Sequence, residues 1–475
     1  MPNDCSVKDL RSYLEVLEEA GELARVKVPV DLNQELGAIS YSNIHHNGPA
    51  LLFEKPGGSD IPIAVGLLAS RRRYALAIGV DPDQVTEEWN RRVANPIPPV
   101  IVEGGPCQQH VLEGDDVDLR RLPVPTWNAN DGGAFLTLSC HVTKDPVTGM
   151  GNVGIYRNQI HDRNTLGLQI QPYGHLKLQM QKKPDEPFPV AIVLGADPVV
   201  TMAACAPLPF GTDELAVAGA LRGKPLEMVP CRTIPLEVPA SAQIVIEGEF
   251  LPGLVHDEGP FGEFTGYYSE FRKARPAIRV KAITHQDHPI LDTTYEGRQP
   301  SGTTVMIGVP REAELRRQIS LPGIKKIHMT PATAGVLHAV VSVDKPFEGF
   351  GKFVGLAVLG CMAGRAVKQV IVVDDDVDPF DPLAVEWAVA TRVQPHRDVD
   401  MIKEVQGVVL DPSMPNTKSG ERGVTSSKMI IDATRYDAKN YSAVCIPSAK
   451  ALEKVDRDWD RYGISSAKGG GKGNS

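Results

Sequence analysis

Short stretches rich in β-branched residues, separated by turn residues, fill the chain between Cys107 and Pro310. A series of short strands at regular spacing favours a barrel over a parallel sheet. We therefore expect a β-barrel in the middle of the chain. The clearest strand candidates are residues 137–143, 190–194, 244–247 and 278–283.

The chain before this barrel combines helices with short strands. Helices are predicted at residues 7–20 and 82–93, where Ser6 and Asp81 can act as N-caps. A group of prolines then marks a linker just before Cys107. Buried strands are predicted at residues 50–54 and 63–66.

After Pro310 the pattern changes to helices that alternate with strands. Such alternation is typical of an α/β domain with partly parallel strands. The aspartates at 374–376 follow one strand, and we interpret them as a solvated turn with helix caps, although ligands also bind at such strand ends. Helices are predicted at 312–319 and 352–365, and strands at 339–343 and 369–373.

The length of 475 residues is too great for one hydrophobic core. We predict an α/β (α+β) fold of three domains: an N-terminal α/β region at 1–105, a central barrel at 106–310 and a C-terminal α/β domain at 311–465. Residues 466–475, rich in Gly, Lys and Ser, are expected to form a disordered tail.

Charge and cysteine usage exclude several classes of protein. The net charge is −9 and the longest basic tract is Arg71–Arg73, which argues against a nucleic-acid partner. Seven scattered cysteines without a CxxC motif are typical of reduced thiols in the cytoplasm. Charges at Asp4 and Lys8, and the lack of a long apolar run, argue against a signal peptide and a membrane span.

The stretch from Gly151 to His175 carries an amide, an arginine and an imidazole among strand-forming residues. In a strand, Asn152 and Tyr156 would share one face, and Arg157 would point to the other unless a bulge re-aims it. Gly154 would let a planar ligand or another backbone come close. Taken alone, this stretch is equally compatible with an edge strand that carries a structural arginine.

Two later stretches favour a functional site. In the first, Thr212 can cap a helix whose first turn contains Glu214. In the second, Glu258 and Glu263 flank a glycine-rich turn among aromatic rings. Carboxyl groups in such surroundings are candidates for raised pKa values and for acid–base chemistry.

Together these stretches resemble the signature of the UbiD-type decarboxylases, which use prenylated FMN. The resemblance extends from about Val7 to Thr434, and five motifs in the right order are more specific than any one of them. It implies a split barrel that holds the flavin. Supporting matches lie at residues 116–123, 239–248, 373–379 and 427–434.

The resemblance also implies a metal site. Asn152, His175 and Glu214 offer a mixed oxygen and nitrogen donor set that suits Mn²⁺. The metal would anchor the cofactor phosphate, with K⁺ nearby; the alternative for His175 is a structural histidine. Cofactor contacts are implied for Asn152, Val153, Gly154, Ile155, Tyr156, Arg157, Gln171, His175 and Glu214, and for Lys352 from the C-terminal domain.

The implied catalytic network consists of Arg157, Glu258 and Glu263. Decarboxylation requires an electron sink, which the prenylated flavin provides in this family. Arg157 would bind the substrate carboxylate or hold the two glutamates, Glu263 would deliver the proton that replaces CO₂, and Glu258 would position Arg157. The pocket is expected near residues 293–295, Gln299 and His328.

The predicted reaction is reversible decarboxylation of an aromatic, heteroaromatic or α,β-unsaturated carboxylic acid. Alternatives are a carboxylase in the cell, a flavin-binding homologue without catalysis, or a metal-assisted hydrolase, whose spacing of carboxylates fits poorly. A flavin prenyltransferase would supply the cofactor. The apolar stretch 353–359 either fills its own domain or is covered by a second copy, and the resemblance favours a homodimer or higher oligomer.

Overall fold

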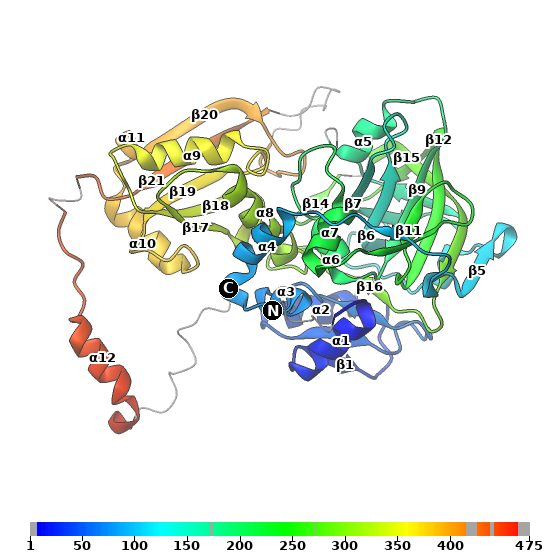
Figure 1. The fold of residues 1–475 in the computed structure, drawn as a ribbon, viewed down its shortest axis with the longest axis horizontal. Helices are drawn as coiled ribbons and strands as arrows, with labels where there is room; N and C mark the ends of the chain where they lie inside the picture. Colours follow the sequence, from blue (N-terminus) through cyan, green and yellow to red (C-terminus); the bar gives the residue numbers. More distant parts are fainter. Residues whose placement is uncertain (1–6, 172–173, 271, 415–424, 438–440, 464–475) are drawn as a thin grey trace.

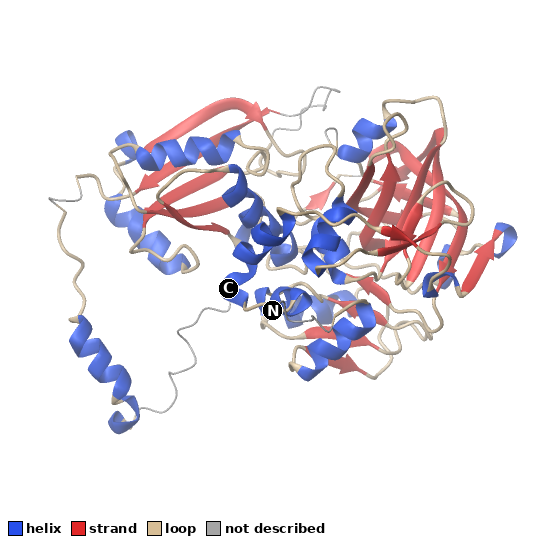
Figure 2. Ribbon diagram, in the orientation of Figure 1, coloured by secondary structure: helices blue, strands red, loops and turns tan. Residues whose placement is uncertain are grey.

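A computed structural model describes residues 7–171, 174–270, 272–414, 425–437 and 441–463. The predicted tail at 466–475 lies outside these ranges. The molecule consists of an N-terminal region, a central barrel and a C-terminal sheet with helices, and strands occur in all three parts (Figures 1 and 2). The predicted mixed α/β fold with a central barrel is confirmed. No helix within the described ranges is long and apolar enough to cross a membrane.

The barrel is an antiparallel sheet closed by the pairing of β12 with β15. Strand β5 (His110–Glu113) pairs with the outer end of β15. The strands in spatial order are β12 (Ile244–Glu258), β9 (Phe188–Leu194), β6 (Phe135–Lys144), β7 (Gly151–Ile160), β8 (Thr165–Leu168) and β15 (Arg272–His285).

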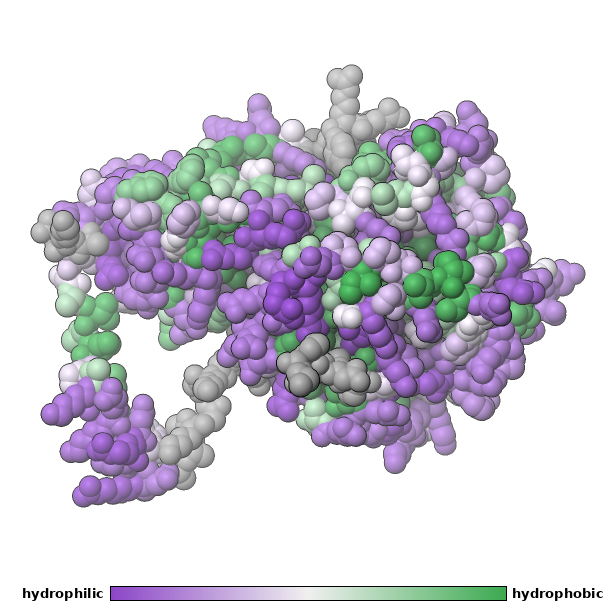
Figure 3. All heavy atoms as spheres, in the orientation of Figure 1, coloured by the Kyte–Doolittle hydropathy of each residue, from purple (hydrophilic) through white to green (hydrophobic). Residues whose placement is uncertain are grey.

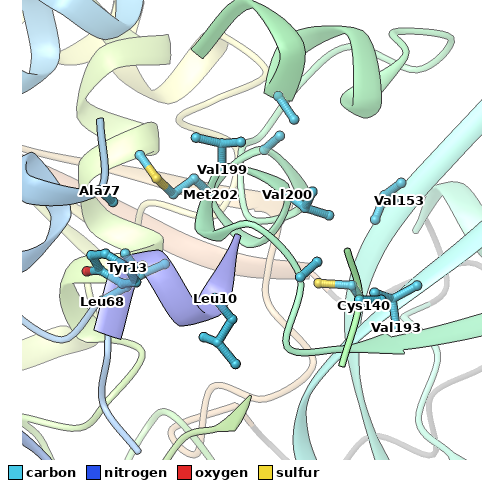
Figure 4. Close-up of a cluster of buried hydrophobic side chains, with 14 of the residues drawn as sticks. Leu10, Tyr13, Leu68, Ala77, Cys140, Val153, Val193, Val199, Val200 and Met202 are labelled. Atoms are coloured by element: carbon cyan, nitrogen blue, oxygen red, sulfur yellow. The ribbon is translucent and has the colours of Figure 1, made fainter. Parts of the chain in front are cut away.

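Alternation of side chains along these strands divides the barrel residues between two hydrophobic clusters. One cluster joins the barrel to helix α6 (Pro198–Ala204). In Figure 4, Cys140, Val153 and Val193 of the barrel lie near Val199, Val200 and Met202 of α6. The contact fixes α6, and with it α7 (Glu214–Arg222), against the start of β7.

The N-terminal region packs α1 (Leu10–Glu19) near a four-stranded sheet. Asp9 caps α1, and the predicted cap Ser6 lies outside the described residues. Helices α2 (Glu35–His45) and α3 (Arg71–Ile78) were not predicted: α2 lacks a side-chain cap, whereas α3 is a short helix of eight residues that Ser70 caps. The sheet order is β1 (Leu23–Val26), β2 (Ala50–Phe53), β3 (Ile63–Val65) and β16 (Leu291–Thr293).

Short elements connect these regions to the barrel. The predicted helix at 82–93 is a 3₁₀ turn, Pro82–Gln84, followed by α4 (Val85–Val93), and Asp81 caps the turn. A small sheet contains β4 (Val100–Ile101), β10 (Glu227–Pro230) and β11 (Glu237–Pro239). Strand β13 (Phe261–Gly262) pairs with β14 (Tyr268–Ser269) in a hairpin. Helix α5 extends over His175–Met180.

The C-terminal part is a five-stranded sheet whose central pairs are parallel, as the sequence predicts. Helix α8 (Thr304–Gln318), which contains Pro310, precedes this sheet in the chain. The order is β17 (Ile324–Met329), β18 (His338–Val343), β19 (Gln369–Asp374), β21 (Thr425–Ala433) and β20 (Val399–Gln406), with helices α9 (Phe350–Gly360), α10 (Pro382–Arg392) and α11 (Pro395–Asp398).

The aspartate run is the predicted solvated turn only in part: residues 375 and 376 form an exposed turn, but neither caps α10, and Asp374 is the last residue of β19. Asp374 is buried, and its Oδ2 lies 2.8 Å from Arg392 Nη1 and accepts from the backbone N–H of Arg435. Asp376 pairs with the same Arg392 guanidinium. The cap of α10 is Asp381. The run therefore supplies carboxylates to a structural ion-pair network.

Helix α12 (Ala449–Arg457) lies at the end of an arm that leaves the body of the molecule (Figure 1, red). The described residues that lead to it, from Tyr441 onward, are exposed. Figure 3 shows hydrophobic residues on this approach, where Val444 and Ile446 are exposed. The arm therefore presents an apolar segment outside the body.

Candidate active site

Strand β7 carries several of the residues that the sequence analysis singled out. The register places Ser139 of β6 opposite Tyr156 and Leu136 opposite Asn158. Two β6 residues, at 137 and 138, therefore oppose the single residue Arg157. The bulge lies on the partner strand, so the alternation along β7 is unbroken between Tyr156 and Asn158.

Arg157 lies at the centre of a buried network with Glu258 and Glu263. Its Nε and Nη2 donate to the two oxygens of Glu258 at 2.7 and 3.0 Å, and its Nη1 donates to Glu263. Nη2 also lies 3.4 Å from the hydroxyl of Ser269. The guanidinium carbon stands 5.0 Å from the centre of the Phe261 ring. The structure thus brings together all three predicted catalytic residues.

Burial alone would lower the pKa of the Arg157 guanidinium, but the carboxylates of Glu263 and Glu258 outweigh burial and raise it. Arg157 therefore stays charged although it is buried. Its two-point contact with Glu258 is the bidentate geometry in which arginine binds carboxylates most firmly. Glu258 consequently fixes the plane of the guanidinium, and the remaining nitrogen faces Glu263.

The hairpin of β13 and β14 positions Glu263. Its backbone N–H donates to the carbonyl of Tyr267 at 3.0 Å, and Gly266, at a φ of +83°, closes the turn. The carboxylate of Asp131 accepts from the backbone N–H of Gly262 at 2.8 Å. The turn that carries Glu263 is therefore anchored to Asp131 through Gly262, the residue before Glu263.

The predicted metal ligands meet at the other end of β7. Asn152 Nδ2 donates to the hydroxyl of Thr143 at 3.2 Å, and Glu214 Oε2 accepts from the backbone N–H of Val153 at 3.0 Å. His175 Nδ1 and Glu214 Oε1 lie 3.7 Å apart. This separation is too long for a hydrogen bond. It lies between the distances of about 3.0 Å and about 4.2 Å that separate adjacent and opposite ligands of an octahedral ion with bonds of about 2.1 Å.

A cavity of about 200 Å³ opens beside Asn152 and His175. Lys182, which pairs with Asp145, and the ring of Phe210 also line it. Asp213 caps α7 and leaves Glu214 in the first turn, so Asp213, rather than the predicted Thr212, is the cap. In the described part of the chain, no three His, Cys, Asp or Glu side chains form a group that could hold a metal, so the predicted set depends on the amide of Asn152.

The remaining residues predicted to contact the cofactor lie around the same strand. Val153 and Ile155 pack toward α6, and the edge of the Tyr156 ring faces His141, with 5.1 Å between ring centres. Burial raises the pKa of the Tyr156 hydroxyl. Gly154 touches the Tyr156 ring, and Gln171 accepts from the N–H of Gly174 through its carbonyl.

Lys352 lies apart from the predicted site residues on β7. It lies in the first turn of α9, and its Nζ is 2.9 Å from Asp400 of β20. His328, which we expected near the pocket, faces Glu312 at 2.9 Å. Gln299 does reach the network region, because its Nε2 donates to the carbonyl of Phe264.

One carboxyl group of this region was missed by the sequence analysis. Glu296 is buried, and Glu263 and Arg157 are among the charges that act on it. Burial raises its pKa to about 8, and the charge of Glu263 adds to this effect. The only sequence signal is a glutamate directly after the predicted pocket segment 293–295.

Comparisons with known proteins identify the family. Three family models for 3-octaprenyl-4-hydroxybenzoate carboxy-lyase match in order: the N-terminal domain at residues 14–93, the Rift-related domain at 100–299 and the C-terminal domain at 304–433. The chain is 36% identical to the UbiD-class enzyme HmfF from Pelotomaculum thermopropionicum, whose structure contains FMN; the match covers 94% of this chain and 100% of HmfF, with a TM-score of 0.85. A second structure of HmfF is an evolved dimeric form in complex with prFMN.

Two further structures agree with this result. The vanillic acid decarboxylase of Sedimentibacter hydroxybenzoicus is 32% identical, with 96% of this chain and 99% of that chain covered and a TM-score of 0.85. The 3,4-dihydroxybenzoic acid decarboxylase AroY of Klebsiella pneumoniae is 30% identical, with coverages of 95% and 99% and a TM-score of 0.83. The chain therefore belongs to the UbiD family and is a carboxy-lyase of that class.

Proposed function

We propose that the protein is a reversible decarboxylase of aromatic, heteroaromatic or α,β-unsaturated carboxylic acids that works with bound prFMN. The observation that carries this proposal is the buried network in which one guanidinium holds both Glu258 and Glu263. Similar enzymes support the substrate class, since their names specify vanillic acid and 3,4-dihydroxybenzoic acid. Net carboxylation in the cell, or a flavin-binding homologue without catalysis, are the alternatives.

The residues at the start of β7 fit a metal that anchors a phosphate. Asn152, His175 and Glu214 would hold Mn²⁺ through an amide oxygen, an imidazole nitrogen and a carboxylate oxygen, with K⁺ nearby. The 3.7 Å separation of His175 and Glu214 and the adjoining cavity leave room for an ion and a phosphate oxygen. Residues 153–157 and Gln171 would line the cofactor.

When bound, prFMN supplies the electron sink that no side chain can provide. The chain's own residues bind and orient the acid. Because Nε and Nη2 of Arg157 are occupied by Glu258, Nη1 is the nitrogen that can exchange partners. A substrate carboxylate that takes Nη1 would displace Glu263 from the guanidinium.

This exchange explains how Glu263 can act as a proton donor. Paired with Arg157, its carboxylate is stabilised in the charged form. Once displaced within a buried site, the same group would favour the protonated form and could deliver the proton that replaces CO₂. Glu258 keeps Arg157 in place throughout, which makes Glu258 the positioning member of the network.

Lys352 would reach the cofactor only after its contact with Asp400 is exchanged. The similar vanillic acid decarboxylase is known in open and closed forms. We propose a comparable approach of the C-terminal domain in this protein. We also propose that the domains end at residues 105 and 310. The protein would work in the cytoplasm, where a flavin prenyltransferase would supply the cofactor.

A homodimer is proposed for two reasons. In α9, Val354 and Val358 fill the domain's own core, whereas Phe353 and Leu356 are about half exposed and are free to contact a second copy. The α12 arm adds the exposed apolar residue Ile446. Covering such surfaces with a second copy is the common solution, and a dimeric form of the similar HmfF exists.

The proposed function is tested by co-expression with a flavin prenyltransferase, followed by measurement of CO₂ release from a panel of aromatic, heteroaromatic and acrylic acids. We expect release from at least one acid, and only from protein that carries the modified flavin. Flavin-loaded protein that neither releases CO₂ from any acid nor exchanges ¹³CO₂ into any of them would contradict the proposal.

A further inference from the structure

Two loops meet beside the Arg157 network, and their backbones are joined on one side by Asn128. Asn128 Nδ2 donates to the carbonyl of Glu296 at 3.0 Å. The same side chain packs so closely against Gly262 that a Cβ placed there would lie 2.5 Å from Nδ2. Asn128 therefore contacts both Gly262, the residue before Glu263, and the backbone of Glu296.

A second link joins the loops on the other side of Glu263. Gln299 Nε2 donates to the carbonyl of Phe264. Nearby, a Cβ at Gly266 would lie 3.2 Å from the Cα of Arg298, so the two backbones are in close contact. The links hold the backbones on both sides of Glu263 against the segment that carries Glu296, and the two buried carboxyl groups are close enough for their charges to interact.

The charges in this region favour one proton on the carboxyl groups. The guanidinium of Arg157 would face three carboxylates if Glu258, Glu263 and Glu296 were all ionised. Glu258 and Glu263 receive hydrogen bonds from Arg157, whereas Glu296 interacts with the hydroxyls of Ser301 and Thr303, with Ser301 Oγ 3.5 Å from its Oε2. Two interacting carboxyls in a buried site do not both ionise readily.

We propose that Glu296 is a second acid of this site, which holds a proton in the resting enzyme and supplies it to Glu263 in each turnover. The inference rests on the proposed decarboxylase function and adds a positioning residue to it. In the resting enzyme Glu263 is the carboxylate paired with Arg157. When substrate displaces it, the O–H bond of Glu296 breaks and its proton passes to Glu263, directly or through one water. Glu263 then transfers this proton to the carbon that has lost CO₂ and is again a carboxylate, and Glu296 takes a proton from solvent.

The groups that face Glu296 are consistent with this role. Burial raises the pKa of Glu296 to about 8, and Glu263 raises it further, whereas Thr303, Ser301 and Arg157 lower it. Cys205, the residue that follows α6, and Tyr295 also interact with Glu296, and burial raises the pKa of both. These two groups therefore remain neutral near pH 7 and leave Glu263 and Arg157 as the charges that act on Glu296.

The direction of the pH effect follows from the site. Activity requires a proton on the Glu263–Glu296 pair, so it should fall on the alkaline side as that proton is lost, near the pKa of about 8. Glu296→Gln removes the resupplying acid with little change in shape. We expect the alkaline limb of the pH–rate profile of this variant to move to lower pH by at least about one unit. At pH 8 its kcat should fall roughly 10-fold, which is less than the loss typical of removing a direct proton donor.

The matched control is Asp292→Asn, which removes another buried carboxyl whose pKa burial raises, to about 7. Asp292 lies in β16 beside α1 and is not part of the Arg157 network. This variant should leave the alkaline limb of kcat/KM unchanged. Glu296→Asp should restore part of the wild-type profile, which a purely structural role for the glutamate would not predict.

A second readout needs neither cofactor nor substrate. In cofactor-free protein, infrared difference spectra taken between acid and alkaline pH show the carbonyl bands of carboxyl groups that lose a proton. We expect Glu296→Gln to lack one band that wild type and Asp292→Asn retain. The inference would be overturned if Glu296→Gln retained every carbonyl band of wild type, or if the alkaline limb of its pH–rate profile did not shift. Failure of wild type to decarboxylate any acid would refute the proposed function instead, while the infrared result still decides the protonation of Glu296.

Discussion

Asp292→Asn should stabilise the protein at neutral and alkaline pH. Asp292 lies on β16 and is buried, and its Oδ1 has no hydrogen-bond partner among the described residues. Burial raises its pKa from 3.8 to about 7. Since each pKa unit corresponds to about 1.36 kcal/mol, ionising this group in the folded protein costs on the order of 4 kcal/mol, an upper limit because the site can relax.

The sign of the pH dependence follows from proton binding. Between the unfolded pKa of 3.8 and the folded pKa of about 7, the folded state binds the extra proton. Stability therefore falls as pH rises through this window and levels off above it. Asparagine carries no titrating group, so the variant should match wild type near pH 4 and exceed it by roughly 2–4 kcal/mol near pH 8.

The assay is thermal unfolding of wild type and Asp292→Asn at a series of pH values, with one common readout. We expect the difference in Tm to grow from pH 4 to pH 7 and then stay constant. Leu138→Ala, which removes a side chain from the lining of the same small cavity, should lower Tm at every pH. A variant that is less stable than wild type at pH 8, or a Tm difference independent of pH, would refute the reasoning.

Three further predictions concern the cofactor and assembly. His175→Ala should lose metal and flavin together, measured by elemental analysis and absorbance, whereas full flavin occupancy would remove His175 from the site. Lys352→Ala should weaken cofactor retention without lowering Tm by more than about 2 °C, as expected for an exposed ion pair; unchanged retention would confine Lys352 to its pair with Asp400. Light scattering should show at least a dimer at micromolar concentration, and removal of residues 441–475 should reduce its stability; a monomeric full-length chain would contradict the dimer.

The barrel and the alternating C-terminal domain could be predicted because their signals are local. Strand-forming runs such as 137–143 and 190–194 lie within β6 and β9, and the helix that begins near Lys352 is present as α9. Helix α2 was missed because its first turn has no capping side chain, so packing rather than local sequence fixes its start.

The site was predictable only in part. The residue types at Arg157, Glu258 and Glu263 stand out in the sequence, but their meeting depends on the pairing of the barrel strands and on the hairpin that carries Glu263, which no single stretch encodes. The raised pKa of Glu296 depends on burial between two loops that are distant in sequence. The ion-pair role of Asp374 and Asp376 was missed because Arg392 and Arg435, their partners, come from later parts of the chain.

The most direct test of the account is CO₂ release by Glu263→Gln, measured with flavin and metal content in the same samples. Glutamine preserves the shape beside Arg157 but cannot supply a proton. The account predicts normal cofactor content and a loss of turnover of about 10²–10⁴-fold, the range of a positioned proton donor. Turnover within about threefold of wild type, with solvent deuterium still entering the product at the reacting carbon, would contradict the assignment of Glu263 as the donor.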